Sequence, residues 1–209
     1  MTRLPARDVH LNDWRWLLGT LRADFATRSL AHGAEFITDV AVTLQGEATV
    51  PVLQLNRDRV LITLRDPNEG VTRREVELAE RISEVAARHG VSAEPDRLQA
   101  LELALDAPDE PAVRPFWAAL LGLVDTGDDV QDPTGALPPL WFQQTESTAR
   151  DRQRFHLDIT VPGDQAADRI AAAVRAGGRV VDRSYEPSFT VLADADGNLA
   201  CVCTELGRE

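Results

Sequence analysis

The stretch RFHLDITVPG at residues 154–163 repeats, in its order of apolar and polar residues, the stretch LQALELALDA at residues 98–107. The offset is about 56 residues, so that Asp106 corresponds to Pro162. Both stretches have the pattern of a strand, and a helical pattern that ends in glycine follows each, at Gly122 and at Gly178. Glycine tolerates the left-handed conformation that commonly follows a helix. The repeat therefore predicts two equivalent modules that begin with a strand and a helix.

Each predicted module continues with further strands. The first ends in LPPLWFQQ (137–144), after a turn at Pro133-Thr134-Gly135, and the second ends in the strands around SFTVLADADGNLACVCT (188–204). The Asp-Gly pair at 196–197 lies between two apolar runs and is a strong turn signal. The sequence thus predicts paired βαβββ modules that form a curved sheet around a pocket.

A different pattern occupies the chain before these modules. The segment HGVSAEPDR (89–97) follows a helical pattern that stops at Gly90, and we place a domain boundary near Pro95, between residues 1–95 and 96–209. We expect helices over 13–22, over 29–44 and from residue 72 onward, and strands over 21–27, 50–56 and 59–66. This order predicts helices packed on a small antiparallel sheet, so the chain is assigned to the α+β class.

Two of these helices carry specific signals. Ser29 is a suitable N-cap for the helix over 29–44. Thr72, with Glu75 three residues later, has the spacing of a capping box. The apolar face expected for the first helix consists of Leu30, Ala34, Ile37 and Ala41. The face expected for the second consists of Val76, Ala79, Ile82, Val85 and Ala86.

Composition excludes several classes of protein. The chain has 209 residues, a net charge of −12 and 44% hydrophobic residues, which is typical of a globular protein and not of a disordered or collagen-like one. We expect no membrane-spanning segment, no signal peptide and no nucleic-acid partner, and hence a cytoplasmic location. The two cysteines, Cys201 and Cys203, suit a reducing compartment. Every basic residue is arginine, which excludes Schiff-base chemistry and a lysine-dependent phosphate loop.

Residues 10–92 resemble pterin-4a-carbinolamine dehydratase. The resemblance rests on GAEFITDVA (33–41), RVLITL (59–64) and GVTRREVELAERI (70–82). That family has a His-His-Pro triplet whose histidines act as acid and base, and at these positions this chain has Thr49, Val50 and Pro51. The family also has a third histidine after the second strand, where this chain has Arg65, Asp66 and Pro67. Dehydration needs a group that titrates near neutral pH, which neither Thr nor Val provides.

Carboxylates are the remaining candidates for catalysis in this domain. Asp66 or Glu69 could replace a histidine if burial raised its pKa, and Glu75 stands where the resemblance places an aspartate. The alternative is that Asp66 and Glu69 are solvated loop charges. The first domain then has the fold of a dehydratase without its catalytic residues.

Residues 97–205 are similar to the vicinal oxygen chelate superfamily, and most closely to its glyoxalase-like domains. The resemblance rests on FWAALLG (116–122), RFHLDITV (154–161) and LADADGNLACVC (192–203). Metal-dependent members take one ligand from the first strand of each module and one from the last. Carried over, these positions are Gln99 and His156 for the first strands, and Gln143, or Gln144 in a shifted register, and Cys201 for the last.

This set lacks both carboxylates that the resemblance implies, so we expect no cofactor and no metal site. The alternative is a divalent metal at Gln99, His156 and Cys201, for which zinc would suit the histidine and the thiolate. A structural role is open as well, with His156 as a hydrogen-bonded strand residue and the two cysteines as small core residues. We expect a ligand pocket lined by Gln99, Trp141, Gln143, His156 and Cys201.

Two functions follow from these patterns. In the first, the chain is a non-catalytic or metal-free protein that binds a small organic molecule, such as a pterin-like compound, with the first domain as a scaffold. In the second, it is a lyase, acting either as a pterin dehydratase with unusual acids or as a lyase or isomerase in the glyoxalase-like pocket. A homodimer is expected in either case, because unpaired sheet edges favour association.

Overall fold

The computed structural model divides the chain into two compact units, Met1–Leu98 and Gln99–Gly207. It describes residues 2–66, 68–121, 123–127, 129–132, 135, 137–147, 155–193 and 199–207. Several predicted features lie outside these residues: the third-histidine position Pro67, the glycine Gly122, the turn residues Pro133 and Thr134, and the turn at 194–198. None of the helices described is long and apolar enough to cross a membrane. The α+β class is confirmed, since each unit combines helices with a sheet.

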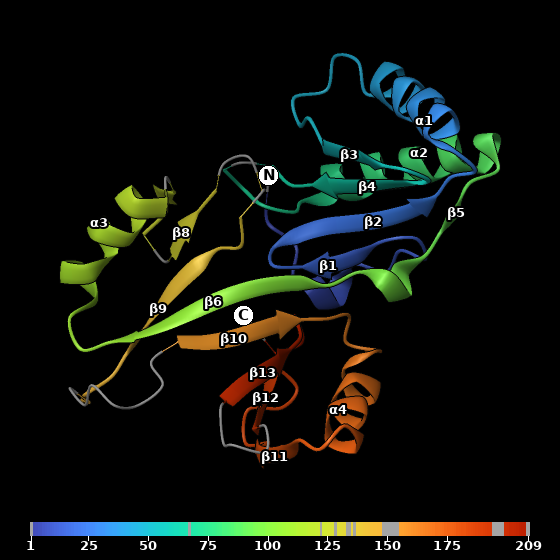
Figure 1. Ribbon diagram of the computed structural model, residues 1–209. Helices are drawn as coiled ribbons and strands as arrows, with labels where there is room; N and C mark the ends of the chain where they lie inside the picture. The colour runs from blue at the N-terminus through green and yellow to red at the C-terminus, as the bar shows by residue number, and fades with distance from the viewer. Residues whose placement is uncertain are drawn as a thin grey trace. The chain divides into compact units, whose positions relative to one another are not determined.

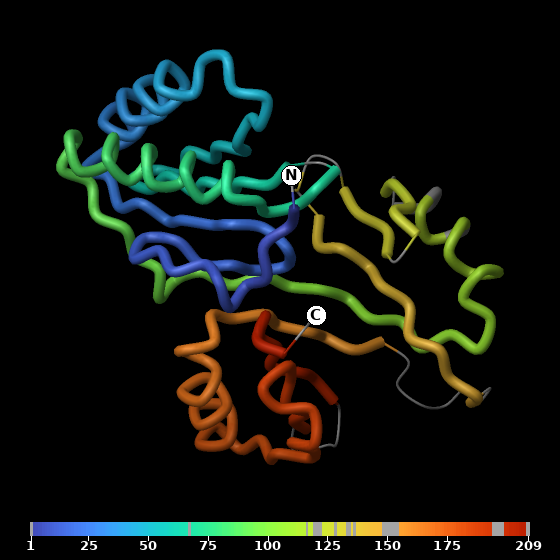
Figure 2. Tube along the Cα trace, turned by 180° about the vertical axis from the view of Figure 1, so that it is seen from behind, coloured from blue at the N-terminus to red at the C-terminus, as the bar shows by residue number. Residues whose placement is uncertain are grey.

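Unit 1 is an antiparallel sheet with two helices on one face (Figure 1). The strand order is β1 (Arg15–Leu17), β2 (Thr20–Ala26), β4 (Arg59–Leu64) and β3 (Val52–Asn56), and the short β5 (Ser92–Ala93) also pairs with β2. Helices α1 (Leu30–Thr43) and α2 (Arg73–His89) contact each other and cover the sheet, as Figure 2 shows from behind. Their shared core includes Phe25, Phe36, Ile62, Leu78 and Ile82.

The helix predicted over residues 13–22 is wrong, because these residues form the hairpin of β1 and β2. Leu18 and Gly19 make its two-residue turn, with φ values of 50° and 66°. Two successive positive φ values match the twist of paired strands, and glycine reaches them without steric cost. The apolar run from Trp16 to Leu18 fits a helix as well as a strand, and pairing of β2 with β4 decides between them.

Helix α1 has the predicted length but buries a different face. Leu30 is 58% exposed, and Ala34 and Ala41 are also exposed, so the predicted face is wrong for these three residues. The residues that the helix buries are Gly33, Phe36 and Val40. Gly33 permits this rotation because a Cβ atom there would lie 2.5 Å from Cδ1 of Leu55 on β3. Glycine at this position thus allows the close approach of helix and sheet without a shift of the Leu55 side chain.

The predicted helix caps are confirmed. The Ser29 side chain accepts a hydrogen bond from the backbone N–H of His32. Thr72 and Glu75 form a complete capping box at the start of α2, and Gly90 ends that helix in the left-handed conformation. Helix α2 buries its predicted face together with Leu78, and only Val76 of that face is half-buried. These local signals are independent of tertiary packing, which is why the sequence indicates them correctly.

Unit 2 consists of the two predicted βαβββ modules. The first contains β6 (Ala100–Ala107), α3 (Glu110–Leu121), β7 (Val124–Asp125), β8 (Asp129–Gln131) and β9 (Leu140–Gln144). The second contains β10 (Phe155–Thr160), α4 (Ala166–Arg175), β11 (Arg179–Asp182), β12 (Phe189–Ala193) and β13 (Leu199–Cys203). Helix α4 ends earlier than predicted, since Gly177, with a φ of 104°, takes the left-handed conformation expected for Gly178.

One eight-stranded sheet joins the modules, in the order β11-β12-β13-β10-β6-β9-β8-β7. The two first strands, β6 and β10, are antiparallel neighbours at its centre, with Ala104 opposite His156 and Glu102 opposite Asp158. Each first strand is parallel to the last strand of its own module. The strand pairing on one side of the centre is therefore repeated on the other. Helices α3 and α4 lie towards opposite ends of this sheet (Figure 1).

Both helices of unit 2 pack on the same face of the sheet. Helix α3 contacts a cluster that contains Leu103, Leu105 and Phe142, and α4 contacts a cluster with Ile159 and Val202. In the observed registers these strand residues alternate with the polar ones. Because successive side chains of a strand point to opposite faces, the polar residues lie on the face without helices.

The buried face of α1 can be tested with two valines of the same helix. Val40 is fully buried, whereas Val42 is 65% exposed. We expect Val40→Ala to lower the free energy of unfolding of unit 1 by about 2 kcal/mol, because a buried valine contributes roughly 1.5–3 kcal/mol. Val42→Ala should change it by less than about 0.5 kcal/mol. Urea-dependent hydrogen exchange of α2 peptides measures both, and equal losses would contradict the observed rotation of the helix.

Candidate functional site

The polar sheet face of unit 2 is defined here as the helix-free side of its four central strands. Strand β6 contributes Glu102, Ala104 and Asp106, and β10 contributes His156 and Asp158. Strand β9 adds Trp141 and Gln143, and β13 adds Cys201. The structure thus brings four of the five predicted ligand residues to one face: Trp141, Gln143, His156 and Cys201.

His156 is paired with a buried carboxylate. Its Nε2 lies 3.3 Å from Oδ1 of Asp106, one strand away. The Asp106 side chain is 5% exposed, whereas that of His156 is 22% exposed. The acid therefore lies beneath the imidazole, and the imidazole ring remains accessible.

Trp141 is held across the sheet by a second buried carboxylate. Its indole Nε1–H donates to Oδ2 of Asp158 at 3.2 Å. Trp141 stands on β9 and Asp158 on β10, and β6 runs between them. The indole ring therefore extends over β6 at Ala104. Ala104 is directly opposite Trp141 and is fully buried. The ring gives the face a fixed aromatic surface in the same cross-strand row as His156, with Ala104 between them.

The remaining predicted residues differ in exposure. Gln143 is exposed, and its neighbour in register is Asp106. Cys201 lies opposite Asp158 and is 8% exposed, and Cys203 is 1% exposed on the same face. Neither cysteine is in a disulfide. Both thiols contribute to the floor of the polar sheet face.

Gln99 does not belong to this face. Its Oε1 accepts a hydrogen bond from Nη1 of Arg169, on the helix side of the unit, at 3.2 Å. The register places Ala100, not Gln99, opposite Thr160 on the polar sheet face. The assignment of Gln99 to the pocket is therefore wrong by one residue, and a shift of one residue moves a side chain to the opposite face. Ala100 is also the residue that corresponds to His156 by the offset of the repeat.

The donor set on this face does not fit a metal ion. The position that corresponds to His156 is an alanine, and Nε2 of His156 lies beside Asp106. Gln143 is a neutral amide, which is a poor ligand for the divalent cations that prefer carboxylates. Within the described ranges, no group of three or more His, Cys, Asp or Glu side chains is arranged to hold a metal.

Glu75 in unit 1 is fully buried and saturated with hydrogen bonds. Its Oε1 accepts from the Thr49 hydroxyl at 2.7 Å. Its Oε2 accepts from the backbone N–H of Thr72 at 2.8 Å and from the Thr72 hydroxyl at 2.6 Å. Thr49 is itself 1% exposed. This carboxylate joins the start of α2 to the segment before β3, and the arrangement is that of a structural anchor.

The pKa of the Asp66 carboxyl is shifted in the wrong direction for a general acid near neutral pH. The backbone N–H groups of Glu69 and Asn68 donate to its Oδ1 at 2.9 and 2.8 Å, and these bonds lower the pKa of the Asp66 carboxyl below its ordinary value. Asp66 is half-buried, and the raised pKa that would let it replace a histidine is therefore not observed. Glu69 is exposed. Both residues lie in a solvated turn between β4 and α2.

The histidines of α1 and α2 serve to join the two helices. Nε2 of His32 lies 3.1 Å from the backbone oxygen of His89, at the end of α2. Nε2 of His89 lies 2.7 Å from Oδ2 of Asp39 on α1. These contacts engage both histidine side chains at the ends of the helices. They do not include Thr49, which is also distant from both histidines in sequence.

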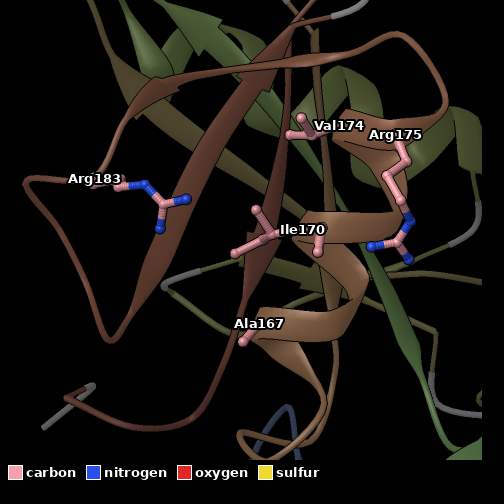
Figure 3. A pocket seen from close by; sticks show the side chains of 6 residues that line it. Ala167, Ile170, Val174, Arg175 and Arg183 are labelled. Carbon is pink, nitrogen blue, oxygen red and sulfur yellow. The ribbon is translucent and has the colours of Figure 1, made fainter.

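A cavity of about 380 Å³ lies on the helix side of unit 2, between α4 and the segment after β11. It is lined by Ala167, Ile170, Ala171, Val174, Arg175 and Arg183. Figure 3 shows Ile170 pointing toward Arg183, whereas the guanidinium of Arg175 lies on the other side of the helix. Arg183 pairs with Glu186 at 2.6 Å. The cavity is mostly apolar and contains none of the residues of the polar sheet face.

The indole bond can be tested with Trp141→Phe, which keeps an aromatic ring but removes the donor to Asp158. We expect the free energy of unfolding of unit 2 to fall by about 1–3 kcal/mol, the cost of leaving a buried acceptor with one bond fewer. Asp158→Asn keeps an acceptor oxygen and should cost less. Thermal unfolding measures both variants, and an unchanged midpoint for Trp141→Phe would contradict the role of the bond.

Residues 102–203 match the family model described as "Glyoxalase-like domain". A comparison with curated proteins found no match.

Three solved structures are similar to parts of the chain. A "transcriptional coactivator/pterin dehydratase" from Brucella melitensis is 20% identical over 36% of this chain and 84% of its own, with a TM-score of 0.34. An "NAD-dependent benzaldehyde dehydrogenase" from Legionella pneumophila is 11% identical over 50% and 97%, with a TM-score of 0.38. A "glyoxalase/bleomycin resistance protein/dioxygenase superfamily member" from Vibrio splendidus 12B01 is 11% identical over 51% and 99%, with a TM-score of 0.35. The match of the family model shows that residues 102–203 are similar to a glyoxalase-like domain.

Proposed function

We propose that this protein binds a small organic molecule on the polar sheet face of unit 2, without a metal ion, and that unit 1 is a scaffold with no dehydratase activity. The observation that carries the proposal is the convergence of His156, Trp141 and two buried aspartates from three neighbouring strands. Ligand sites in proteins typically combine an apolar or aromatic surface with a few placed polar groups. The polar sheet face offers both.

Rigidity of the polar groups supports binding over a purely structural role. Asp106 and Asp158 are each 4% exposed, and each contacts one partially exposed ring. Asp158 thus holds the indole by a hydrogen bond, and Asp106 lies beside the imidazole, before any ligand arrives. A ligand that meets fixed groups loses less free energy to ordering of the site.

The scaffold role of unit 1 is supported by the state of its carboxylates. Glu75 is saturated by Thr49 and Thr72, and Asp66 is held in its charged form by backbone N–H groups. Neither is placed to give and take a proton near neutral pH, which a dehydratase needs. The alternative of an active dehydratase therefore has no observed acid–base group among these residues.

Binding can be tested by nuclear magnetic resonance with a library of small uncharged aromatic and carbonyl compounds. We expect hits to shift the Trp141 indole signal and the His156 ring signals, because these groups are the exposed parts of the face. His156→Gln should weaken such hits at least about tenfold, the effect of one lost hydrogen bond of about 1.4 kcal/mol. His10→Gln, at an exposed position of unit 1, is the matched control and should leave binding unchanged.

Hits that shift neither Trp141 nor His156 would contradict the proposed site. Hits that appear only after addition of Zn²⁺, Mn²⁺ or Ni²⁺ would contradict binding without a metal.

The scaffold role can be tested by stopped-flow dehydration of a 4a-hydroxytetrahydropterin. We expect the purified protein to give the uncatalysed rate, because Asp66 is held in its charged form and Glu75 is buried among its hydrogen-bond partners. Asp66→Asn should give the same rate. A rate above background that Asp66→Asn abolishes would show that unit 1 is an active dehydratase.

A further inference from the structure

We propose that the cavity beside α4 is a second binding site, which takes a small organic anion made of an apolar body and a carboxylate group. The cavity lies on the helix side of unit 2 and shares no residue with the polar sheet face. This site is therefore additional to the proposed function and does not depend on it. An arginine with available hydrogen-bond donors faces the apolar side of a helix here, across a space of about 380 Å³.

The apolar wall of the cavity is one side of α4. Ala167, Ile170, Ala171 and Val174 are spaced by three and four residues, so their side chains follow one another along the helix. Ile170 is 8% exposed and belongs to the core under the helix, whereas Val174 is 41% exposed. Small-molecule sites typically have volumes of roughly 300–1,000 Å³, and this cavity falls in that range. An alkyl chain or aromatic ring in the cavity would cover Val174.

The opposite wall carries Arg183, and Figure 3 shows its side chain and Ile170 facing each other. Nη1 of Arg183 donates to Oε1 of Glu186 at 2.6 Å. The same oxygen accepts a hydrogen bond from the Thr190 hydroxyl on β12 at 2.8 Å. Thr190 thus holds the acid, and the acid holds the guanidinium at the cavity.

The Arg183 guanidinium keeps donors for a ligand. It has five N–H donors in one plane, and among the residues that the structure describes only its Nη1 has an observed partner. The Nε–H and Nη2–H groups lie along one edge of the plane, and their spacing matches the two oxygens of a carboxylate. A carboxylate can therefore accept two charge-assisted hydrogen bonds from Arg183 while Glu186 keeps its own.

The charges around the cavity favour an anion. Both charged residues that line it are arginines, and Glu186 offsets only one of them. The Arg175 guanidinium lies on the other side of α4, where it adds positive charge without facing the ligand. Asp182, the acid next to Arg183 in the chain, accepts a hydrogen bond from the backbone N–H of Ser184. An ammonium group in the cavity would be repelled by both guanidinium groups.

The probe is octanoate, compared with 1-octanol and octylammonium, which have the same chain length and an uncharged or a cationic head. Methyl spectra of protein labelled at isoleucine and valine observe the cavity through Ile170 and Val174. We expect octanoate to shift both signals in a saturable manner. It should bind at least about tenfold more tightly than octylammonium, because only the anion pairs with the guanidinium edge.

Two arginine variants separate direct contact from general charge. Arg183→Gln should lower the affinity for octanoate at least about tenfold and leave that for 1-octanol unchanged, because it removes the guanidinium and keeps the apolar wall. Arg175→Gln is the matched control. It removes the same charge without a contact, and it should lower the affinity less than about threefold because solvent and salt screen that charge. Backbone spectra check that both variants are folded.

Two alanine variants test the space itself. Ala167 is exposed and lines the cavity, whereas Ala172 is exposed on another side of α4. Leucine is a good helix former, so both alanine-to-leucine variants should fold. Ala167→Leu should weaken octanoate and 1-octanol alike, at least about fivefold, because the larger side chain occupies the cavity. Ala172→Leu should change neither affinity.

The outcomes separate this site from the proposed function. Octanoate binding that Arg183→Gln leaves unchanged overturns the site, and so does octylammonium that binds as tightly as octanoate. Unchanged Ile170 and Val174 signals overturn it as well. If octanoate shifts the Trp141 and His156 signals instead, the cavity falls and binding on the polar sheet face stands. His156→Gln should leave binding in the cavity unchanged, so either proposal can fail without the other.

Discussion

The antiparallel pairing of β6 with β10 is the constraint on which the rest of unit 2 depends. It places Ala104 opposite His156 and Glu102 opposite Asp158, and it joins the two modules into one sheet. Because side chains alternate along a strand, this one register decides which residues meet α3 and α4 and which lie on the polar sheet face. A shift by one residue would bury His156 under a helix and expose Ile159.

The contrast between the two units lies in what their buried acids do. In unit 1, the buried acid is Glu75, and both of its carboxylate oxygens accept hydrogen bonds from Thr49 and Thr72. In unit 2, Asp106 and Asp158 each contact a ring that remains partly exposed. An acid that ends in a closed set of hydrogen bonds stabilises the fold, whereas an acid that orients an accessible group can also serve a ligand.

Prediction from sequence succeeded where the signal is local and failed where distant residues decide. The capping box of Thr72 and Glu75, the N-cap Ser29 and the repeat of βαβββ modules are local or periodic patterns. The hairpin at Leu18 and the rotation of α1 around Gly33 depend on pairing and packing across the unit. Asp106 was missed as a site residue because its partner His156 is 50 positions away in the sequence. A signal was present, since an acid between Leu105 and Ala107 in a buried strand is unusual.

The position of the two cysteines gives the molecule a built-in reporter of its own motion. Cys201 and Cys203 are the only thiols of the chain, and both lie on β13, where they are 8% and 1% exposed. A thiol reagent can reach Cys203 only when the packing around its buried side chain opens. The rate of labelling therefore measures how often this part of the sheet opens. Since β13 pairs with the strand that carries His156, that rate also reports how firmly the floor of the site is held.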